Sequence, residues 1–340
     1  MNSFPSVAVV ILNWNGKNYL SKFLPSVLRS TYQNLQIIVA DNDSSDDSLE
    51  FLRNHYPDVR IISNEKNFGF AEGYNKALIQ VEADYYILLN SDVEVTEGWI
   101  EPVISMMEND LSVAAAQPKL KDWNNRQLFE YAGAAGGFID GYGYPFCRGR
   151  IFDTVEKDEG QYDTPMEVFW ASGAAFFIRK SCWYKAGGFD ADFFAHMEEI
   201  DLCWRLKNLG YKIVYCPDST VYHIGGGTLD AGNPYKTYLN YRNNLVMMLK
   251  NLPPFRGFLL LFIRFWLDLI SLLKFLADGK VKQAWAISRA HRYFFLNLFK
   301  NRKKAFFNKY ASTAGCYKGS IVWAYFVKKA KKFSQLTIDQ

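Results

Sequence analysis

The sequence predicts an α/β protein built on a mostly parallel sheet, and three observations lead to this prediction. Short apolar runs rich in β-branched residues alternate with helix-like segments through the first 90 residues. Each of these runs stops abruptly at Asn or Asp. The chain has 340 residues, 49% of them hydrophobic, which is enough for a sizeable core. Because strands that alternate with helices pair in parallel, we expect one sheet with helices on both faces.

Polar side chains follow three predicted strands at the point where each strand ends. The strands cover residues 6–12, 35–40 and 87–89, and the apolar spacing of residues 20–28 and 49–52 predicts helices between them. Ligands of open α/β sheets bind beyond the carboxyl ends of strands, so these side chains favour a nucleotide site. Turn formation or helix capping remains the alternative role. The side chains are Asn13, Asn15, Asp41, Asp43, Asn90 and Asp92.

Further polar and Gly-rich segments follow in a fixed order. The ordered set comprises Val9–Gly16, Asp41–Asp46, Asn64–Asn75, Leu88–Asp92, Trp170–Ala175, Gly187–Asp190, Met197–Arg205 and Val221–Gly227. This set resembles the signatures of inverting family 2 glycosyltransferases, and it is most similar to their rhamnosyltransferase-like branch. The resemblance implies a GT-A fold, a Rossmann-like and mostly parallel sheet with helices on both faces, over residues 1–230.

The resemblance also implies how a nucleoside-diphosphate sugar would bind. Asp41 matches the position that accepts the N–H of a uracil or thymine ring, and an ionised carboxylate is suited to this because it only accepts hydrogen bonds. Asn67 and Asn75 lie on either side of Gly69, whose missing side chain would let the backbone approach the nucleotide closely. An ordinary loop is the alternative for this Gly-rich turn.

A divalent cation, Mg²⁺ or Mn²⁺, is implied by the same family pattern. Asp92 would bind it through one carboxylate and leave the other positions to phosphate oxygens and water. His223 would be a second ligand, and an imidazole is commoner on Mn²⁺ than on Mg²⁺. Asn90 stands where the Asp-x-Asp pattern has its first Asp, which lowers the negative charge of the site.

Three carboxylates crowd into four residues at Glu198, Glu199 and Asp201, and mutual repulsion raises their proton affinity. The resemblance gives Glu199 the role of general base, which deprotonates the acceptor hydroxyl. Glu198 stays an alternative, because Glu199 replaces the usual Asp. Acidic residues also stabilise the first turn of a helix through its dipole.

The acceptor is expected near a further group of residues. Aromatic faces can pack on the C–H surfaces of a sugar, although core packing and an i, i+4 ion pair between Asp201 and Arg205 are the alternatives. The group consists of Trp170, Gly173, Asp201, Trp204 and Arg205. The segment 123–165 is irregular in pattern and is expected to form a flexible loop on the acceptor side.

The resemblance implies transfer of one sugar, with inversion, to a glycan or a lipid-linked saccharide in surface polysaccharide synthesis. A dTDP-sugar, dTDP-rhamnose first, or a UDP-sugar would be the donor. One rival is a catalytically silent binding protein, motivated by Asn90 and Glu199. Another is a nucleotidyltransferase, but the first loop offers only Lys17 for phosphate binding.

The last third of the chain differs in charge and pattern. Residues 231–340 hold 20 Lys and Arg against 3 Asp and Glu, whereas residues 1–230 hold 19 against 32. The apolar stretch 255–277 places its polar residues on one arc of a helix. With four charges it is a poor membrane span. It is expected to lie in a membrane interface, with packing on the catalytic domain as the alternative. The residues of the polar arc are Arg256, Arg264, Asp268, Ser271 and Lys274.

The location of the protein is expected from this region and from the start of the chain. We expect a basic, aromatic-rich helical region over residues 231–340 that contacts a membrane surface and not nucleic acid. The first six residues lack the pattern of a signal peptide. Five cysteines show no zinc-binding spacing and fit reduced thiols. We therefore expect a cytoplasmic protein, peripheral at the inner face of the cytoplasmic membrane.

Overall fold

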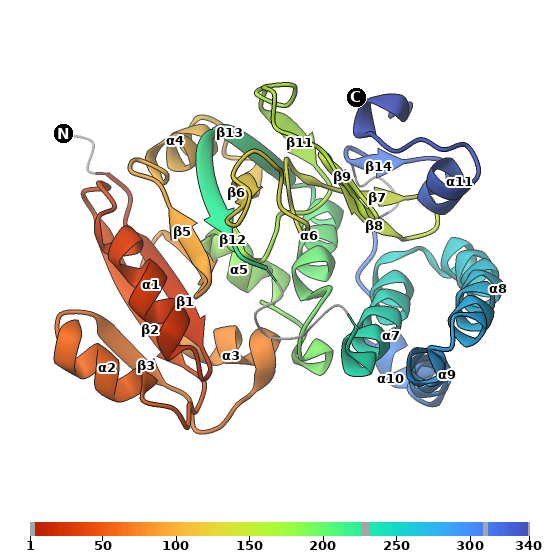
Figure 1. The fold of residues 1–340 in the computed structure, drawn as a ribbon, viewed down its shortest axis with the longest axis horizontal. Coiled ribbons are helices and arrows are strands. Elements are labelled where there is room, and N and C mark those ends of the chain that lie inside the picture. Colours follow the sequence, from red (N-terminus) through yellow and green to blue (C-terminus); the bar gives the residue numbers. More distant parts are fainter. Residues whose placement is uncertain (1–3, 226–231, 309–311, 339–340) are drawn as a thin grey trace.

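The structure is a computed structural model that describes residues 4–225, 232–308 and 312–338. A nine-stranded mixed sheet forms its centre (Figure 1). In sheet order its strands are β11 (Met166–Val168), β13 (Lys212–His223), β6 (Val113–Asp122), β12 (Ala175–Arg179), β4 (Tyr85–Asn90), β1 (Val7–Asn13), β2 (Leu35–Asp41) and β3 (Arg60–Ser63), and β5 (Val93–Val95) pairs with β13. Strands β4, β1, β2 and β3 are parallel, as the alternating pattern predicts. Strands β12, β11 and β5 pair antiparallel with their neighbours, so the sheet is mixed and not mostly parallel as expected.

The register of the parallel strands brings predicted site residues to one edge of the sheet. Asn13 at the end of β1 pairs with Asp41 at the end of β2. On the other side of β1, Leu12 pairs with Asn90 of β4. The expectation that three polar strand ends share one edge is therefore confirmed.

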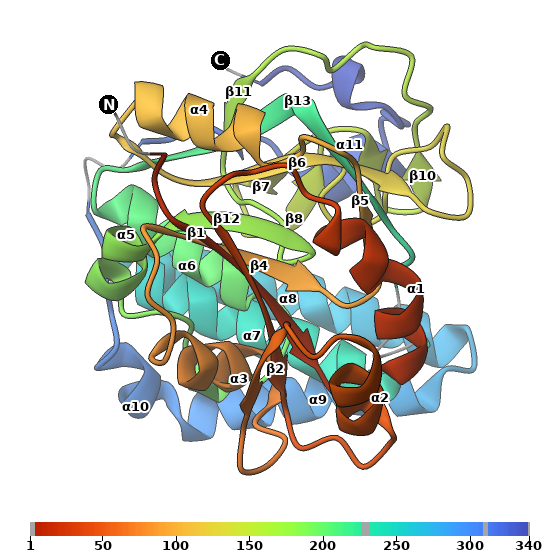
Figure 2. The same ribbon diagram turned by 90° about the vertical axis from the view of Figure 1, so that its left-hand side faces the viewer.

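Helices cover both faces of the sheet (Figure 2), and successive residues of β1 show why. Val7 and Val9 point into one apolar core, and Ala8 and Val10 point into the other. The first core takes residues from α1 (Lys17–Leu28), α2 (Ser48–His55) and α4 (Glu101–Asn109). The second core takes residues from α3 (Gly69–Leu78), α5 (Lys180–Ala186) and α6 (Glu198–Asn208).

A second, smaller sheet corrects the expectation of a flexible loop over residues 123–165. Its order is β10 (Thr154–Val155), β9 (Arg150–Ile151), β8 (Pro145–Cys147), β7 (Gly137–Asp140) and β14 (Cys316–Tyr317). Four of its strands come from that segment, and β14 returns from the end of the chain to pair with β7. Helix α11 (Ile321–Phe326) follows β14, and the backbone N–H of Ile321 donates to Asp140 Oδ2 at 2.9 Å. Two short 3-10 turns complete the described elements, Ala191–Phe193 and Phe333–Gln335.

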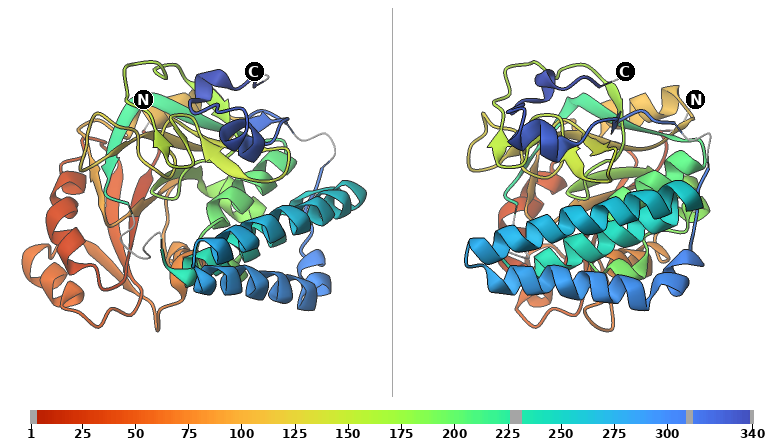
Figure 3. Two further views of the ribbon diagram at one scale, coloured as in Figure 1. Left: turned by 45° about the vertical axis from the view of Figure 1, so that its right-hand side comes forward. Right: turned by 90° about the vertical axis from the view of Figure 1, so that its right-hand side faces the viewer.

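Four helices make up the rest of the C-terminal region: α7 (Pro234–Asn251), α8 (Pro254–Ala277), α9 (Val281–Leu296) and α10 (Leu298–Arg302). Figure 3 shows α7, α8 and α9 side by side. Within the described ranges, no helix is both long enough and apolar enough to cross a membrane.

Helix α8 turns part of its polar arc inward and its apolar residues outward. Arg264 and Asp268 are fully buried, whereas Phe258 is 75% exposed and Phe262 is 56% exposed. Arg264 donates to Asn244 Oδ1 at 2.5 Å and to Asp268 Oδ1 at 3.2 Å, and its guanidinium lies 3.8 Å from the ring centre of Tyr144. Helix α8 therefore packs on the rest of the protein through polar contacts and leaves an apolar surface outside.

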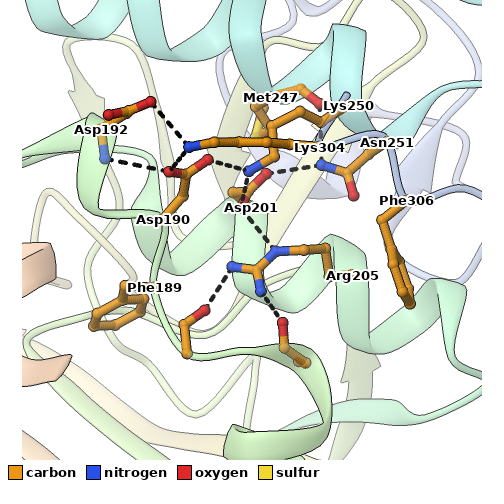
Figure 4. Close-up of polar contacts among 12 residues, drawn as sticks. Phe189, Asp190, Asp192, Asp201, Arg205, Met247, Lys250, Asn251, Lys304 and Phe306 are labelled. Carbon is orange, nitrogen blue, oxygen red and sulfur yellow. Dashed lines mark hydrogen bonds and ion pairs between the residues drawn. The ribbon is translucent and has the colours of Figure 1, made fainter. Parts of the chain in front are cut away.

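A buried carboxylate joins α6 to α7 (Figure 4). Asp201 Oδ2 lies 2.9 Å from both Arg205 Nε and Lys250 Nζ, and Oδ1 accepts from Asn251 Nδ2 at 2.9 Å. Burial alone would raise the pKa of Asp201, but the cations of Lys250 and Arg205 lower it below its usual value. Lys250 also reaches Asp190 Oδ2 at 2.7 Å, so the network extends to the segment before α6.

Replacing Asp201 with Ala should destabilise the protein by about 3–5 kcal/mol, because Arg205 and Lys250 would be left buried without their carboxylate. Urea unfolding followed by circular dichroism measures this change. Asp47→Ala is the matched control, since the Lys17–Asp47 pair is exposed, and it should leave the unfolding midpoint unchanged. Equal midpoints for the two variants would contradict the assigned role of Asp201.

Candidate active site

The edge formed by β1 and β2 holds a buried amide and a buried carboxylate. Asn13 Nδ2 donates to Asp41 Oδ1 at 3.0 Å and to Ser44 Oγ at 3.1 Å, and Asp41 Oδ2 accepts from the Ser44 N–H at 3.0 Å. Each carboxylate oxygen of Asp41 keeps one lone pair beyond these bonds. Asp41 is thus fixed in place by the loop that follows it.

The neighbouring predicted residues shape the loops at this edge. Asn15, at φ +50°, accepts from the backbone N–H groups of Ser45 and Asp46 at 2.7 and 3.2 Å, and so joins the loops after β1 and β2. Asp43 has φ +63°, and its side chain is exposed. Asn15 thus uses its amide oxygen within the loops, whereas the Asp43 carboxylate is open to solvent.

Asn42 is a site residue that the sequence reasoning missed. Its Nδ2 donates to Asn67 Oδ1 and to the Gly69 carbonyl, both at 3.0 Å. Its Oδ1 accepts from Asn64 Nδ2 at 3.1 Å and from the Phe68 N–H at 3.2 Å. This one buried side chain fixes the Gly-rich turn to the end of β2. The signal for it was its position between two strand-end Asp residues.

The end of β4 meets the end of β13 at a pair of ionisable groups. His223 Nε2 lies 3.1 Å from Asp92 Oδ1 and 3.4 Å from Asn90 Nδ2. On its other side, His223 Nδ1 lies 3.2 Å from Glu130 Oε1. Burial would lower the pKa of His223, but the carboxylates of Asp92 and Glu130 together raise it to about 10. Sequence reasoning missed Glu130, because its segment shows no periodic pattern.

A divalent cation would be held by Asp92 and His223, which offer one oxygen and one nitrogen ligand. Such a mixed set suits Mn²⁺ better than Mg²⁺. The ion would have to replace the imidazole proton, so binding would release a proton. Among the described residues, no three His, Cys, Asp or Glu side chains form a ready-made metal site. The remaining ligands would therefore come from phosphate oxygens and water. Gly226 and Gly227, at the end of the predicted motif, lie outside the described residues.

Glu198 and Glu199 begin α6, and both are short of hydrogen-bond partners. The Oε2 atom of each is buried and has no partner among the described residues. Burial, followed by repulsion from Glu199, raises the pKa of Glu198 well above its usual value. Burial raises the pKa of Glu199 to about 7. Glu198 is 4% exposed, whereas Glu199 is partly exposed, so Glu199 is the more accessible of the two.

Gly173 connects the two glutamates to the end of β4. A Cβ atom at position 173 would lie 4.0 Å from Glu199 Cβ and 3.5 Å from the ring of Phe70. The next residue, Ala174, accepts from the Asn90 N–H at 3.0 Å. Glu199 and Asn90 therefore approach the same two-residue segment from different elements. This places an acid–base group beside the polar strand ends.

Comparison with known proteins identifies the chain. Residues 8–182 match the model of glycosyl transferase family 2. The chain belongs to this family. It is 26% identical over 230 residues to the N-acetylglucosaminyl-diphospho-decaprenol L-rhamnosyltransferase of Mycobacterium tuberculosis, covering 63% of this chain and 75% of that protein. It is 25% identical over 218 residues to the rhamnosyltransferase WbbL of Escherichia coli, covering 62% and 80%.

Solved structures share the fold of this glycosyltransferase. The structure of GalNAc-T7 with UDP, GalNAc and Mn²⁺ superposes with a TM-score of 0.59 at 17% identity, covering 75% of this chain and 50% of that chain. The Pyrobaculum calidifontis mannosyltransferase PcManGT, with GDP-Man and Mn²⁺, gives a TM-score of 0.52 at 14% identity, covering 89% and 84%. The predicted family and the GT-A-like fold are confirmed.

Of the two predicted acceptor-side tryptophans of the transferase, Trp170 is buried and Trp204 is partly exposed. Trp170 is 5% exposed and its Nε1 donates to the Phe138 carbonyl at 2.9 Å. A Cβ atom on Gly137 would lie 2.1 Å from the Trp170 ring, so the two residues are in close contact. Trp204 packs edge-on against Phe169, with 5.2 Å between ring centres. Trp170 therefore serves core packing, which was the alternative to sugar contact, and the acceptor-side role of Trp204 stays a prediction.

Three charged or polar predicted residues of the transferase make contacts that hold the fold. Asp201 and Arg205 belong to the buried network, and Arg205 Nη2 further donates to the Gly188 carbonyl at 2.7 Å. Asn75 exchanges two hydrogen bonds with the backbone of Phe189, at 2.9 and 3.0 Å. These contacts give Asp201 and Arg205 the ion-pair role that was the alternative to acceptor contact, whereas the donor-side role of Asn75, which is partly exposed, stays a prediction.

Replacing Gly69 with Ala should destabilise the transferase more than replacing Gly187, although both have left-handed φ angles, +76° and +80°. Each change costs about 1–2 kcal/mol for the backbone conformation. At position 69 the new Cβ would also lie 2.5 Å from the ring of Phe194, which adds about 1–3 kcal/mol of overpacking, whereas position 187 is open. Urea unfolding of both variants checks this, and equal losses would contradict the close contact.

Proposed function

We propose that this glycosyltransferase acts by a single inverting displacement, with Glu199 as general base. The observation that supports this most strongly is the pair of carboxyl groups at the start of α6, each with a buried Oε2 atom that has no partner among the described residues, next to the segment that holds the end of β4. A carboxyl group with a pKa of about 7 suits proton transfer at neutral pH. Glu198 is more deeply buried and so less accessible to an acceptor, which makes it the weaker candidate.

In the proposed reaction, Glu199 accepts the proton of an acceptor hydroxyl as its oxygen attacks the anomeric carbon. The bond from that carbon to the diphosphate oxygen breaks, and the electron pair leaves with the nucleoside diphosphate. Asp92 and His223 would hold a divalent cation, which when bound supplies positive charge to the leaving diphosphate. Asp41 and the turn held by Asn42 would bind the nucleoside. One displacement inverts the anomeric configuration.

For the sugar donor we propose dTDP-rhamnose first and a UDP-sugar second. Two relatives are named rhamnosyltransferases, and each matches this chain over most of its own length. For the acceptor we propose a lipid-linked saccharide of cell-surface polysaccharide synthesis. The name of the mycobacterial relative specifies a diphospho-decaprenol acceptor, which supports this choice.

We further propose that α8 and α9 rest on the inner face of the cytoplasmic membrane. Large apolar side chains of α8, α9 and α10 are exposed together, and a groove of about 500 Å³ opens between α7 and these helices. The excess of Lys and Arg over residues 231–340 favours an anionic lipid surface. The exposed apolar residues include Phe255, Phe258, Phe262, Trp266, Ile270, Trp285, Phe295 and Phe299.

Replacing Glu199 with Gln should lower kcat by about 100-fold or more, because the base is lost. Glu198→Gln is the matched control and should have the smaller effect. In the unmodified enzyme kcat should fall as pH falls through 7, because protonated Glu199 cannot accept a proton. About a tenth of the carboxyl groups stay ionised at pH 6.

The assay is release of nucleoside diphosphate from dTDP- and UDP-sugars with a lipid extract and Mn²⁺ or Mg²⁺. A larger loss in Glu198→Gln than in Glu199→Gln would move the base to Glu198. Nucleotide binding without release from any donor would favour the silent binding protein.

A double change of Phe258 and Phe262 to Asp should weaken binding to phosphatidylglycerol vesicles by more than about tenfold, since each exposed ring would contribute about 1.5–3 kcal/mol on burial in lipid. Sedimentation of the protein with vesicles measures this. The control is the double change of Ile79 and Leu111 to Asp. Both residues are exposed on the catalytic domain, and this variant should bind vesicles as the unmodified chain does. Equal loss in both pairs would contradict the proposed membrane face.

A further inference from the structure

The segment directly before the two glutamates has an unfavourable backbone. Phe194, His196 and Met197 have φ angles of +65°, +69° and +71°. Side chains of L-residues clash with the backbone in this left-handed region, so such residues persist only where the surroundings impose them. Met197 is also the residue from which α6 starts. The direction in which Glu198 and Glu199 leave the backbone thus depends on whatever holds residues 193–197.

Asn243 of α7 holds this segment. Its Nδ2 donates to the carbonyls of Phe193, Ala195 and His196 at 3.1, 2.9 and 2.7 Å. Asn243 is fully buried. Without the side chain, the carbonyls of Ala195 and His196 would lose this donor, and the Phe193 carbonyl would keep Arg242.

Arg242 sets the orientation of the Asn243 side chain. Its Nε donates to Asn243 Oδ1 at 2.7 Å, so the NH₂ group of the amide must face the carbonyls. Its Nη2 donates to the carbonyls of Asp192 and Phe193 at 2.9 and 2.7 Å. Together the two side chains donate to the backbone carbonyls of residues 192, 193, 195 and 196.

The Gly-rich turn holds the same segment from the opposite side. The Phe194 carbonyl accepts from the N–H groups of Phe70 and Ala71 at 2.7 and 3.1 Å. Residues 193–197 therefore lie between the first turn of α3, next to the proposed nucleotide site, and α7. Of these two contacts, the one from α7 comes from the C-terminal region and the one from α3 comes from the catalytic domain.

We propose that Asn243, oriented by Arg242, is a positioning residue for the general base. By holding the carbonyls of residues 193–196 it fixes the left-handed segment and, through it, the first turn of α6 that carries Glu198 and Glu199. The C-terminal helices are then part of the catalytic machinery in addition to their proposed membrane contact. This inference rests on the proposed function, since it requires the base to be one of these two glutamates.

Asn244 provides a matched control on the same helix. It is 3% exposed, and its side chain donates to the Gly143 carbonyl at 2.7 Å and accepts from Arg264 at 2.5 Å. Gly143 lies between β7 and β8 of the second sheet, and Arg264 belongs to α8. A change to Ala at either position removes a buried amide from α7, but only Asn243 contacts the segment before the base.

The test compares Asn243→Ala, Asn244→Ala and the unmodified full-length chain by thermal unfolding, turnover and amide hydrogen exchange followed by mass spectrometry. Asn243→Ala should speed exchange at residues 193–200 and lower kcat about 10- to 100-fold, because small displacements of a reacting group are costly. The KM for the sugar donor should change less than about twofold, since the nucleotide site is formed by other residues. Asn244→Ala should leave both exchange in this segment and kcat within about twofold.

Three results would overturn the inference. The first is unchanged exchange at residues 193–200 in Asn243→Ala. This result would show that Asn243 does not hold the segment, whatever the activity of the variant. The second is faster exchange with unchanged kcat, and the third is an equal loss of kcat in Asn244→Ala. If the unmodified chain turns over no donor, the proposed function fails and the catalytic role with it, while exchange still decides whether Asn243 holds the segment. If Asn243→Ala does not fold, Arg242→Lys, which keeps the charge but lacks the guanidinium Nε donor, takes its place with the same readouts.

Discussion

Asp201 carries a negative charge inside the protein, and the opposite charges that surround it join the catalytic half to the C-terminal helices (Figure 4). The three neighbouring carboxyl groups of this helix differ in pKa because their surroundings differ. Lys250 and Arg205 lower the pKa of Asp201, whereas burial raises the pKa of Glu198 and Glu199. One helix thus begins with two carboxyl groups of raised pKa, which include the proposed base, and continues with an anion that holds the fold.

The C-terminal region combines two unlike surfaces on adjacent helices. Helix α7 directs amides and cations toward α6 and the segment before it, through Asn243 and Lys250. Helix α8 buries Arg264 and Asp268 against the rest of the protein and exposes aromatic side chains outward. A soluble helix usually does the reverse. This inversion explains why a polar arc on a helical wheel is compatible with both alternatives considered for the segment, packing on the protein and contact with a membrane.

Sequence periodicity located the residues whose positions depend on strands. Asn13, Asp41 and Asn90 could be placed at one edge because parallel strands end together. Roles that depend on contacts between distant segments could not be predicted. Glu130 meets His223 from a segment with no periodic pattern, and a sequence does not tell whether Trp170 faces a sugar or the core. Likewise the polar arc of α8 was visible, but not the side of the helix that turns inward.

The central claim is a single displacement at the anomeric carbon, assisted by one base at the start of α6. Its most direct test is the anomeric configuration of the product, measured from the one-bond carbon–proton NMR coupling constant at the anomeric carbon after turnover of a nucleotide sugar of known configuration. A single displacement gives one product with the configuration opposite to that of the donor. A product that retains the configuration of the donor would require a second displacement and a nucleophile that the proposed mechanism does not contain, and would contradict the claim.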